Sequence, residues 1–326
     1  MKENDIRKRE TFDRYLELVK KDCAVYFDKS AFITVACPAC GSISQREEFE
    51  KSGFMYVTCN DCATLFVNPR PPQKMLSRFY TESPSTSYWI NEFFKPVAEA
   101  RREKIFKPRA AHIGKYIEKG RAKIIGDIGA GFGIFLEELR KIIPDLTCVA
   151  IEPSQEMAQI CRDKGLIAQE SSIEALDGFV NHFDILCSFE LLEHLFDIRQ
   201  FMEKARNLLC KGGLLYLTTL NAMGFDILTL REKSKSVSPP HHLNFLNPRS
   251  ITLLAEKTGF TVEALSTPGE LDWSIVEGMY YEDNIAIGHF WEYMAAHREE
   301  ECKKEFQEWL KRHKLSSHMR VLLRKR

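Results

Sequence analysis

A glycine-rich turn near the middle of the chain constrains the fold more than any other feature. Residues 127–133 read DIGAGFG, directly after an apolar pair at 124–125 and directly before a second apolar run at 134–136. Glycines let the backbone turn tightly and approach a ligand closely, and the N–H groups at the start of the following helix point toward that ligand. The pattern predicts that a buried strand, a turn and a helix together hold a nucleotide cofactor.

The positions of these glycines separate two kinds of cofactor. A dinucleotide fingerprint needs a glycine at position 134, where the chain has Ile134. The carboxylate of Asp127 suits a cationic ligand, because a negative side chain at the head of the turn repels a pyrophosphate. Hydride transfer is therefore disfavoured. The turn residues that we expect to contact the cofactor are Asp127, Gly129, Gly131, Phe132 and Gly133.

Acidic residues follow two further apolar runs. Residues 146–151 read as a second buried strand that ends in Glu152, whose carboxylate can accept hydrogen bonds from both hydroxyls of a ribose. Residues 183–189 read as a fourth strand, and the segment after it, 190–194, reads ELLEH. In this order, the turn, Glu152 and this segment resemble the class I S-adenosylmethionine (SAM)-dependent methyltransferases over about residues 75–326.

The resemblance implies that SAM binds at the turn, with Glu152 as the ribose-binding acid and Phe189 as a further cofactor contact. It also implies that the segment before the first strand covers the cofactor, which makes Tyr88 a candidate to contact SAM or the substrate. Simple packing of Tyr88 within that segment stays equally open. A Rossmann-like domain that binds another nucleotide, or none, is the alternative to a methyltransferase.

Alternating strands and helices along the second half of the chain predict a doubly wound sheet. Helices are expected over 134–143, before Pro144, and from Asp197 as N-cap to Gly212. The expected strands are the run at 124–125, then 146–151, 166–169, 183–189, 214–219, 260–266 and 319–323. Residues 285–313 read as a helical insertion before the last strand. The fold class is thus α/β, a Rossmann-like, seven-stranded methyltransferase sheet.

Two Cys-x-x-Cys pairs near the N-terminus predict a metal site. Residues 41–58 separate the pairs, which is within the spacing typical of structural zinc sites. Two such turns complete a closed shell of four thiolates, and zinc would supply folding energy that the few apolar residues between them cannot. Redox-active pairs or unrelated buried cysteines are the alternative. The expected ligands of a structural Zn²⁺ are Cys37, Cys40, Cys59 and Cys62.

Composition limits the partners and the compartment. Lys plus Arg and Asp plus Glu both number 46, so no excess of positive charge favours a nucleic acid. The N-terminus has no apolar signal core, and no run is long enough to span a bilayer, so we expect a cytoplasmic protein with no membrane contact. The expected domains are an N-terminal helix over 1–30, a zinc ribbon over 31–70, a linker with lid helices over 71–120 and the methyltransferase domain over 121–326.

The segment after the fourth strand carries the residues that methyl transfer needs. Such a reaction holds donor and acceptor close together and usually removes a proton from the acceptor. His194 titrates near neutral pH and is expected to be the general base, with Glu193 and Glu190 as supporting groups. The alternatives are that these residues cap the next helix, or that they bind a divalent ion, as in some quinone-biosynthesis O-methyltransferases that the segment also resembles.

A histidine-rich loop follows the fifth strand, at the edge of the sheet where ligands bind. His241 and His242 are expected to hold a polar acceptor, such as a hydroxyl or a diphosphate; hydrogen bonding within the loop is the alternative. The sequence before the last strand, which includes His318, raises the same possibility.

The combination of modules narrows the substrate. Four cysteines, a Pro-rich link, the Tyr88 segment and the Glu193-His194 pair together resemble bacterial methyltransferases that carry an N-terminal zinc-binding domain and act on sugars or nucleotide-sugars. This resemblance implies a small, sugar-linked acceptor with an oxygen or carbon as the methylated atom. A ribosomal or transfer RNA methyltransferase, a quinone-type O-methyltransferase and a non-catalytic adaptor are the alternatives. The sequence leaves the acceptor atom and the oligomeric state open.

Overall fold

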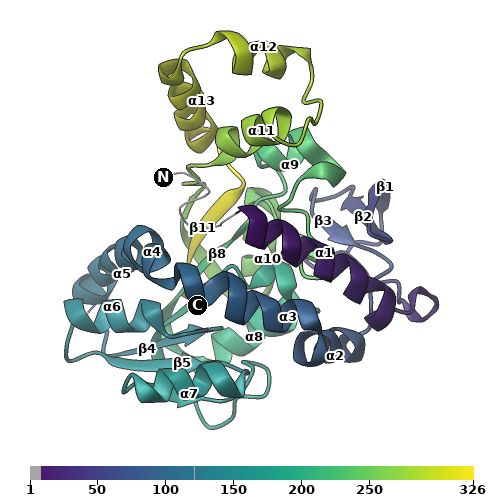
Figure 1. Ribbon diagram of the computed structural model, residues 1–326. Helices are drawn as coiled ribbons and strands as arrows, with labels where there is room; N and C mark the ends of the chain where they lie inside the picture. Colours follow the sequence, from purple (N-terminus) through teal and green to yellow (C-terminus); the bar gives the residue numbers. More distant parts are fainter. Residues whose placement is uncertain (1–8, 121) are drawn as a thin grey trace.

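A mostly parallel sheet of seven strands forms the centre of the structure, a computed structural model that describes residues 9–120 and 122–326 (Figure 1). Its strand order is β10-β11-β8-β7-β4-β5-β6. Neighbouring strands are parallel except around β11, which runs antiparallel to β8 and β10. The strands are β4 (Ile124–Ile128), β5 (Thr147–Ile151), β6 (Ile167–Gln169), β7 (Phe183–Phe189), β8 (Leu209–Leu220), β10 (Phe260–Ser266) and β11 (His318–Lys325). The expected seven-stranded methyltransferase sheet is confirmed.

Helices pack on both faces of this sheet. One face is covered by α5 (Lys107–Gly120), α6 (Ile134–Ile142) and α7 (Gln155–Asp163), and the other by α8 (Ile198–Leu208) and α10 (Pro248–Lys257). Apolar residues recur at helical spacing on the buried sides of α6 and α8, so each helix has one face to bury against the strands. The sheet is therefore doubly wound, as the alternation of elements predicts.

The fifth strand is longer than expected and the helix before it is shorter. Asp197 caps α8 as predicted, since its side chain accepts hydrogen bonds from two backbone N–H groups of the first turn. The helix ends at Leu208 rather than at Gly212, because Leu209 already pairs with Phe183 of β7. The pairing and burial of Leu209 in the sheet therefore end the helix, although the apolar residues before it recur at helical spacing.

A second, smaller sheet joins the cysteine-bearing region to the methyltransferase part. Its order is β1-β2-β3-β9, and all neighbours are antiparallel. Three of the strands come from the N-terminal region, whereas β9 follows β8 much later in the chain. The strands are β1 (Gln45–Lys51), β2 (Phe54–Cys59), β3 (Leu65–Val67) and β9 (Asn244–Phe245). The cysteine region and the loop after β8 therefore form one folded unit.

Helical segments precede the small sheet in the chain and connect it to the large one. Of the expected N-terminal helix over 1–30, residues 1–8 lie outside the described residues; α1 (Arg9–Tyr26) and η2 (Lys29–Ala31) follow them. Residue 121, where the methyltransferase domain was expected to begin, also lies outside the described residues. The linker is helical along most of its length: α2 (Gln73–Glu82), α3 (Pro84–Tyr88), η3 (Trp89–Phe94), η4 (Lys95–Val97), α4 (Ala98–Arg101) and η5 (Arg102–Phe106).

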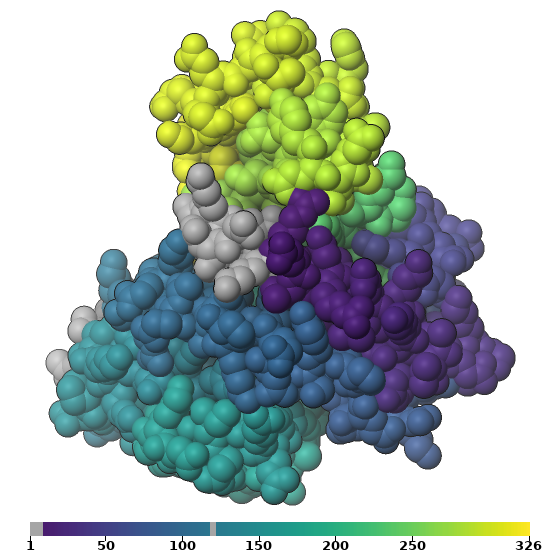
Figure 2. All heavy atoms as spheres, viewed as in Figure 1, coloured from purple at the N-terminus to yellow at the C-terminus, as the bar shows by residue number. Residues whose placement is uncertain are grey.

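The helical insertion before β11 begins earlier than predicted. It contains α11 (Asp272–Tyr281) in addition to α12 (His289–His297) and α13 (Glu300–Arg312), and it protrudes from the body of the molecule (Figure 2). Three short helices complete the fold: η6 (Leu192–His194), α9 (Phe225–Leu230) and η7 (Arg231–Lys233). Among the helices that the structure describes, none has the length and apolar character to cross a bilayer.

Candidate active site

The three glycines of the turn after β4 play different structural roles. All three have positive φ, at 74° for Gly129, 55° for Gly131 and 68° for Gly133. A Cβ at Gly133 would lie 2.7 Å from the Leu166 side chain, so this glycine is needed for packing at the start of α6. A Cβ at Gly131 would meet nothing within 4 Å. Gly131 is therefore the point at which a ligand can come closest to the backbone.

Asp127 is a buried carboxylate that lacks one of its partners. It is only 2% exposed, and its Oδ1 makes no hydrogen bond within the described residues. Burial raises its pKa to about 8, with Glu152 acting in the same direction and Arg109 against it. An unpartnered buried carboxylate is costly, and the cationic amino group of SAM would supply the missing partner. The residue fits the cofactor.

Glu152 has the hydrogen-bonding capacity that a ribose requires. Its Oε2 accepts from the Gly131 N–H at 2.8 Å and its Oε1 from the Ser154 N–H at 2.9 Å. A carboxylate has about four lone-pair sites, so one site on each oxygen is left. Those two sites match the two hydroxyls of a ribose. Glu152 also fits, and its contact with Gly131 places it beside the open side of the turn.

Aromatic residues surround the turn, but Tyr88 is not among the described contacts. The ring of Phe94 lies 5.0 Å from that of Phe132, and the Phe189 ring lies 4.1 Å from the guanidinium carbon of Arg109. Tyr88 packs instead in the apolar cluster around α1 and β2. Phe94 and Arg109 were not singled out in the sequence, although both belong to the aromatic and basic stretch before β4.

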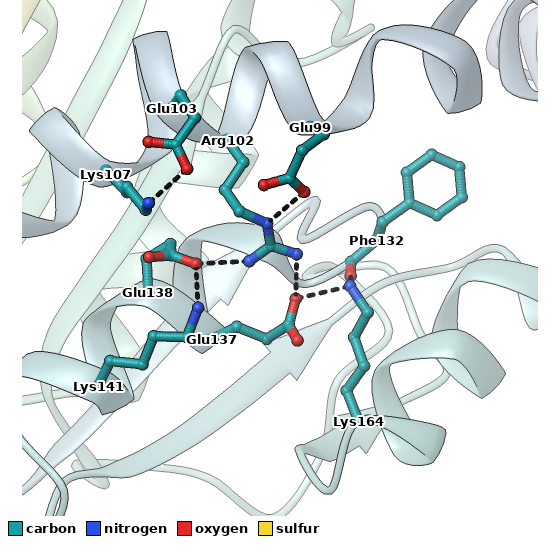
Figure 3. A network of polar contacts seen from close by, with 9 residues as sticks. All are labelled: Glu99, Arg102, Glu103, Lys107, Phe132, Glu137, Glu138, Lys141 and Lys164. Carbon is teal, nitrogen blue, oxygen red and sulfur yellow. Dashed lines mark hydrogen bonds and ion pairs between the residues drawn. The ribbon is translucent and has the colours of Figure 1, made fainter.

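An ion-pair network holds the turn from the outside (Figure 3). Arg102 bonds Glu137 at 3.0 Å and the buried Glu138 at 2.5 Å, and Lys164 bonds Glu137 at 2.7 Å. Lys164 also donates to the carbonyl of Phe132 at 2.7 Å, which is part of the turn itself. The network therefore ties the linker helices, α6 and α7 to the backbone that carries the glycines.

The segment after β7 begins with a rare backbone conformation. Glu190 has a φ of 51°, which residues with a Cβ seldom adopt, and its N–H donates to the Thr218 carbonyl at 2.9 Å. The chain then forms η6, which carries Glu193 and His194. Such conformations persist only where the surrounding structure holds them, and they are concentrated at functional sites.

His194 lies next to the histidine-rich loop, although the two segments are far apart in the sequence. Its ring centroid lies 4.8 Å from that of His242 and 6.2 Å from that of His241. Burial, together with the neighbouring His242 and His241, holds the pKa of His194 well below its ordinary value, so the imidazole is neutral. The expected base and the two expected substrate-binding residues therefore occupy one site.

Tyr80 determines which nitrogen of His194 carries the proton. The Tyr80 hydroxyl lies 3.2 Å from His194 Nδ1 and 3.5 Å from the carbonyl of His241. A carbonyl only accepts, so where Tyr80 donates its one proton to it, Nδ1–H of His194 is the donor to Tyr80. This arrangement leaves a lone pair on Nε2 of His194. Tyr80 was not singled out in the sequence, because nothing local relates it to His194.

The two carboxyl groups beside His194 differ in charge. Burial acts to raise the pKa of Glu190, but His318, whose Nδ1 lies 3.5 Å away, and Arg109 outweigh it and lower that pKa. Burial and the charge of Glu190 raise the pKa of Glu193 well above its ordinary value. Glu193 accepts a hydrogen bond from the Thr219 hydroxyl at 2.8 Å. An ionised Glu190 thus lies near a neutral Glu193.

The same side chains can also form a metal site. One oxygen of Glu193, one nitrogen of His194 and one nitrogen of His242 all lie within 4.8 Å of one another. Imidazole and carboxylate are ordinary ligands of divalent transition metals. The site can therefore hold either an acceptor next to a base or a divalent ion.

The four cysteines form a compact cluster. Their sulfurs all lie within 4.8 Å of one another, and the pairs Cys37–Cys62 and Cys40–Cys59 are each 3.5 Å apart. A tetrahedral zinc with Zn–S bonds of about 2.3 Å would separate its sulfurs by about 3.8 Å. The two turns are also equivalent, because the N–H of Gly41 and of Ala63 each donates to the carbonyl of the first cysteine of its pair. The cluster is compatible with zinc.

The second cysteine turn is hydrogen-bonded to the segment after the histidine loop. Asn247 donates to the carbonyls of Cys62 and Ala63 at 2.9 and 2.8 Å. Tyr56 of β2 donates its hydroxyl to the carbonyl of His242 at 2.7 Å. The cysteine region therefore fixes the backbone on which the two histidines lie.

The histidine loop is in turn fixed to the segment of His194. The N–H of Leu243 donates to the carbonyl of Glu193 at 2.7 Å, and the Asn244 amide donates to the carbonyl of Leu195 at 2.7 Å. Arg70, which is almost fully buried, bonds both Asn244 and the carbonyl of Phe196. Cysteine region, histidine loop and η6 thus form one hydrogen-bonded unit.

Comparison with known proteins shows the family of the chain. Residues 97–265 match a family described as "Methyltransferase domain". A ubiquinone biosynthesis O-methyltransferase of Bartonella tribocorum is 26% identical over 148 residues, which cover 42% of this chain and 59% of that protein. One from Methylocella silvestris is 32% identical over 101 residues, 29% of this chain and 39% of that protein. The matches thus span 39% and 59% of these relatives' own lengths.

A solved structure shows the same fold. The plantazolicin methyltransferase BpumL, in complex with S-adenosylhomocysteine (SAH), aligns with a TM-score of 0.50 at 13% identity, over 77% of this chain and 93% of that one. The family match covers just over half of the present chain, including the turn, Glu152 and the segment of His194. The chain therefore belongs to this methyltransferase-domain family.

Proposed function

We propose that this enzyme methylates an oxygen or carbon atom of a small polar acceptor, a sugar or nucleotide-sugar, with His194 as the general base. The observation that carries the proposal is the meeting of His194 with His241 and His242 in one site, where the Tyr80 hydroxyl lies 3.2 Å from Nδ1 of His194. We further propose that the enzyme acts neither on nucleic acids nor at membranes.

SAM, when bound, supplies an electrophilic methyl group. The protein residues have to orient the acceptor and remove its proton. A neutral His194 accepts that proton at Nε2, while Nδ1–H stays hydrogen-bonded to Tyr80 and keeps the ring oriented. The ionised Glu190 lies near His242, and the rings of His242 and His241 lie 4.8 and 6.2 Å from that of His194.

The four-cysteine cluster is proposed to hold a structural Zn²⁺. A closed shell of four thiolates leaves no position for a substrate, so the ion would stabilise the fold and not take part in the reaction.

A quinone-type O-methyltransferase is the second candidate, favoured by the cluster of Glu193, His194 and His242. A divalent ion held there would use the lone pair that a base needs, so the two functions of His194 exclude each other. The two candidates are distinguished by removing ions from this site with a chelator that leaves the cysteine site loaded, and then adding Mg²⁺, Mn²⁺ or Zn²⁺. Activity that needs the added ion would favour this second candidate.

The experiment that tests the proposed function is mass spectrometry of reactions with SAM and separate pools of nucleotide-sugars, quinone precursors and RNA. A methylated sugar with equimolar SAH is the expected result. A methylated quinone precursor or RNA would reject the sugar acceptor. SAM binding without any product would favour the adaptor.

Asp127→Asn is predicted to remove a pH dependence of cofactor binding. In the free enzyme the pKa of Asp127 is about 8, so the carboxyl has to lose a proton before it pairs with the ammonium of the ligand. SAH affinity of the native enzyme should therefore rise as pH increases toward about 8, by at most about tenfold per unit, and level off above it. Calorimetry between about pH 6 and pH 9 measures this. The asparagine variant should bind more weakly at high pH and show a flatter profile; an unchanged slope would contradict the role of Asp127.

A further inference from the structure

A lysine-rich pocket lies beside the histidine loop, outside the site described above. It has a volume of about 350 Å³ and lies between α1, the turn from β1 to β2, the segment 233–239 and the insertion. Four of its lining residues are lysines and one is an acid: Lys20, Lys51, Lys233, Lys235 and Asp283. The protein as a whole has no net charge, so this excess of positive charge is local.

The carboxylates around the pocket are already shared among several cations. Asp283 pairs with Lys235 at 3.3 Å and with Arg9 at 2.5 Å. Asp13 pairs with Lys235 at 3.1 Å and also with Arg9 at 3.6 Å. Lys235 is thus held in place by two acids, while the remaining lysines are not paired by them.

Of the lysines that these acids leave unpaired, Lys51 is the most buried. It is partly buried, and its ammonium donates to the carbonyl of Ser234 at 2.6 Å. An ammonium has three donors, so this bond leaves capacity for an anion. Burial lowers the pKa of Lys51 to about 8; Glu232 acts against that shift and Lys235 adds to it. A negatively charged ligand would stabilise its charged form.

The pocket and the active site share one loop and one helix. Val237, Ser238 and Pro239 line the pocket, and His242 bonds the carbonyl of Ser236 through Nδ1 at 2.6 Å. On α1, Val19 lines the pocket, and Tyr15, one turn earlier, lies 5.7 Å from the ring of His241. The pocket therefore adjoins the loop that carries the two histidines.

We propose that this lysine pocket binds the diphosphate of a nucleotide-linked acceptor and so positions the acceptor at the histidine loop. The inference rests on the proposed function, since it names the class of acceptor. Two phosphates offer several anionic oxygens to the ammonium groups of Lys51, Lys233 and Lys20, and charge-assisted hydrogen bonds of this kind are strong.

Binding of uridine diphosphate (UDP), inorganic pyrophosphate and SAH to the full chain, measured by calorimetry, tests the proposal. The variant is Lys51→Met with Lys233→Met, and the matched control is Lys211→Met, an exposed lysine on β8 away from the pocket. We expect UDP to bind the native protein, and the double variant to bind it about tenfold or more weakly, with unchanged SAH affinity. The control variant should bind UDP as the native protein does.

Other outcomes reject parts of the proposal separately. Pyrophosphate that binds as tightly as UDP would show a site for free phosphates and overturn the nucleotide-linked acceptor. Absent UDP binding, or UDP binding that the double variant retains, would overturn the pocket itself. UDP binding that depends on the lysines, combined with methyl transfer to a quinone precursor or RNA, would reject the proposed function while the pocket stands as a nucleotide site. If the double variant loses thermal stability or SAH affinity, Lys20→Met, at an exposed position on α1, repeats the test.

Discussion

Replacement of His194 by alanine should lower turnover by about 10²- to 10⁴-fold, the usual contribution of a positioned general base. The described contacts of the His194 side chain are with Tyr80, His241 and His242 and not with the glycine turn, so SAH affinity should change little. Turnover is measured as SAH formed with the acceptor that the mass spectrometry identifies. SAH affinity is measured by calorimetry on the same protein.

Two further variants make the result specific. Tyr80→Phe removes the acceptor of the Nδ1–H bond without removing the base, so a smaller loss of turnover, about tenfold, is expected. His182→Ala changes an exposed histidine just before β7, at the opposite end of that strand from His194, and should leave turnover unchanged. If His194→Ala keeps the native rate, His194 has no part in the proton transfer, and the nearby His242 becomes the residue to test.

The strands and the cofactor turn could be predicted because the signals for them are local. Each central strand is an apolar run bounded by glycine, proline or charge, and the turn after β4 has a spacing that few other structures need. The boundary between α8 and β8 could not be read in the same way. Whether Leu209 ends a helix or starts a strand depends on Phe183, which is distant in the sequence and pairs with it only in the folded sheet.

The sequence placed the active-site groups at one edge of the sheet, but it did not predict which of their side chains contact each other. His194 and the histidine pair were each recognised from neighbouring residues, and no periodicity relates the two segments. Tyr80 and Arg109 were missed for the same reason, since each contacts the site across a large sequence separation. The pairing of β3 with β9 is a further long-range contact. This pairing joins the strands of the cysteine region to the segment that directly follows the histidine loop.

Loss of the Zn²⁺ that we propose for the cysteine cluster is therefore predicted to lower turnover by about 10²-fold or more, while SAH still binds. The four thiolates hold the turn at Cys62 and Ala63, to which Asn247 is bonded, and β2 carries the tyrosine that holds His242. Without the ion the turns lose the bonds that close them, and the backbone of the histidine loop loses its support. The glycine turn and Glu152 lie on other elements. Metal content, thermal unfolding, SAH binding and turnover, measured before and after chelation under reducing conditions, distinguish these effects.

Tyr56→Phe isolates this coupling from the stability of the metal site. It removes one hydroxyl and leaves the buried carbonyl of His242 without that donor, which should cost about 1–2 kcal/mol of stability and lower turnover by about tenfold. Tyr26→Phe is the matched control, because the Tyr26 hydroxyl also donates to a backbone carbonyl, that of Glu82, which does not belong to the histidine loop. If the cysteine region only stabilises the fold, both variants should keep native turnover once folded. A loss of turnover confined to Tyr56→Phe would mean that the hydrogen bond between the cysteine region and His242 sets the geometry in which His194 meets its substrate.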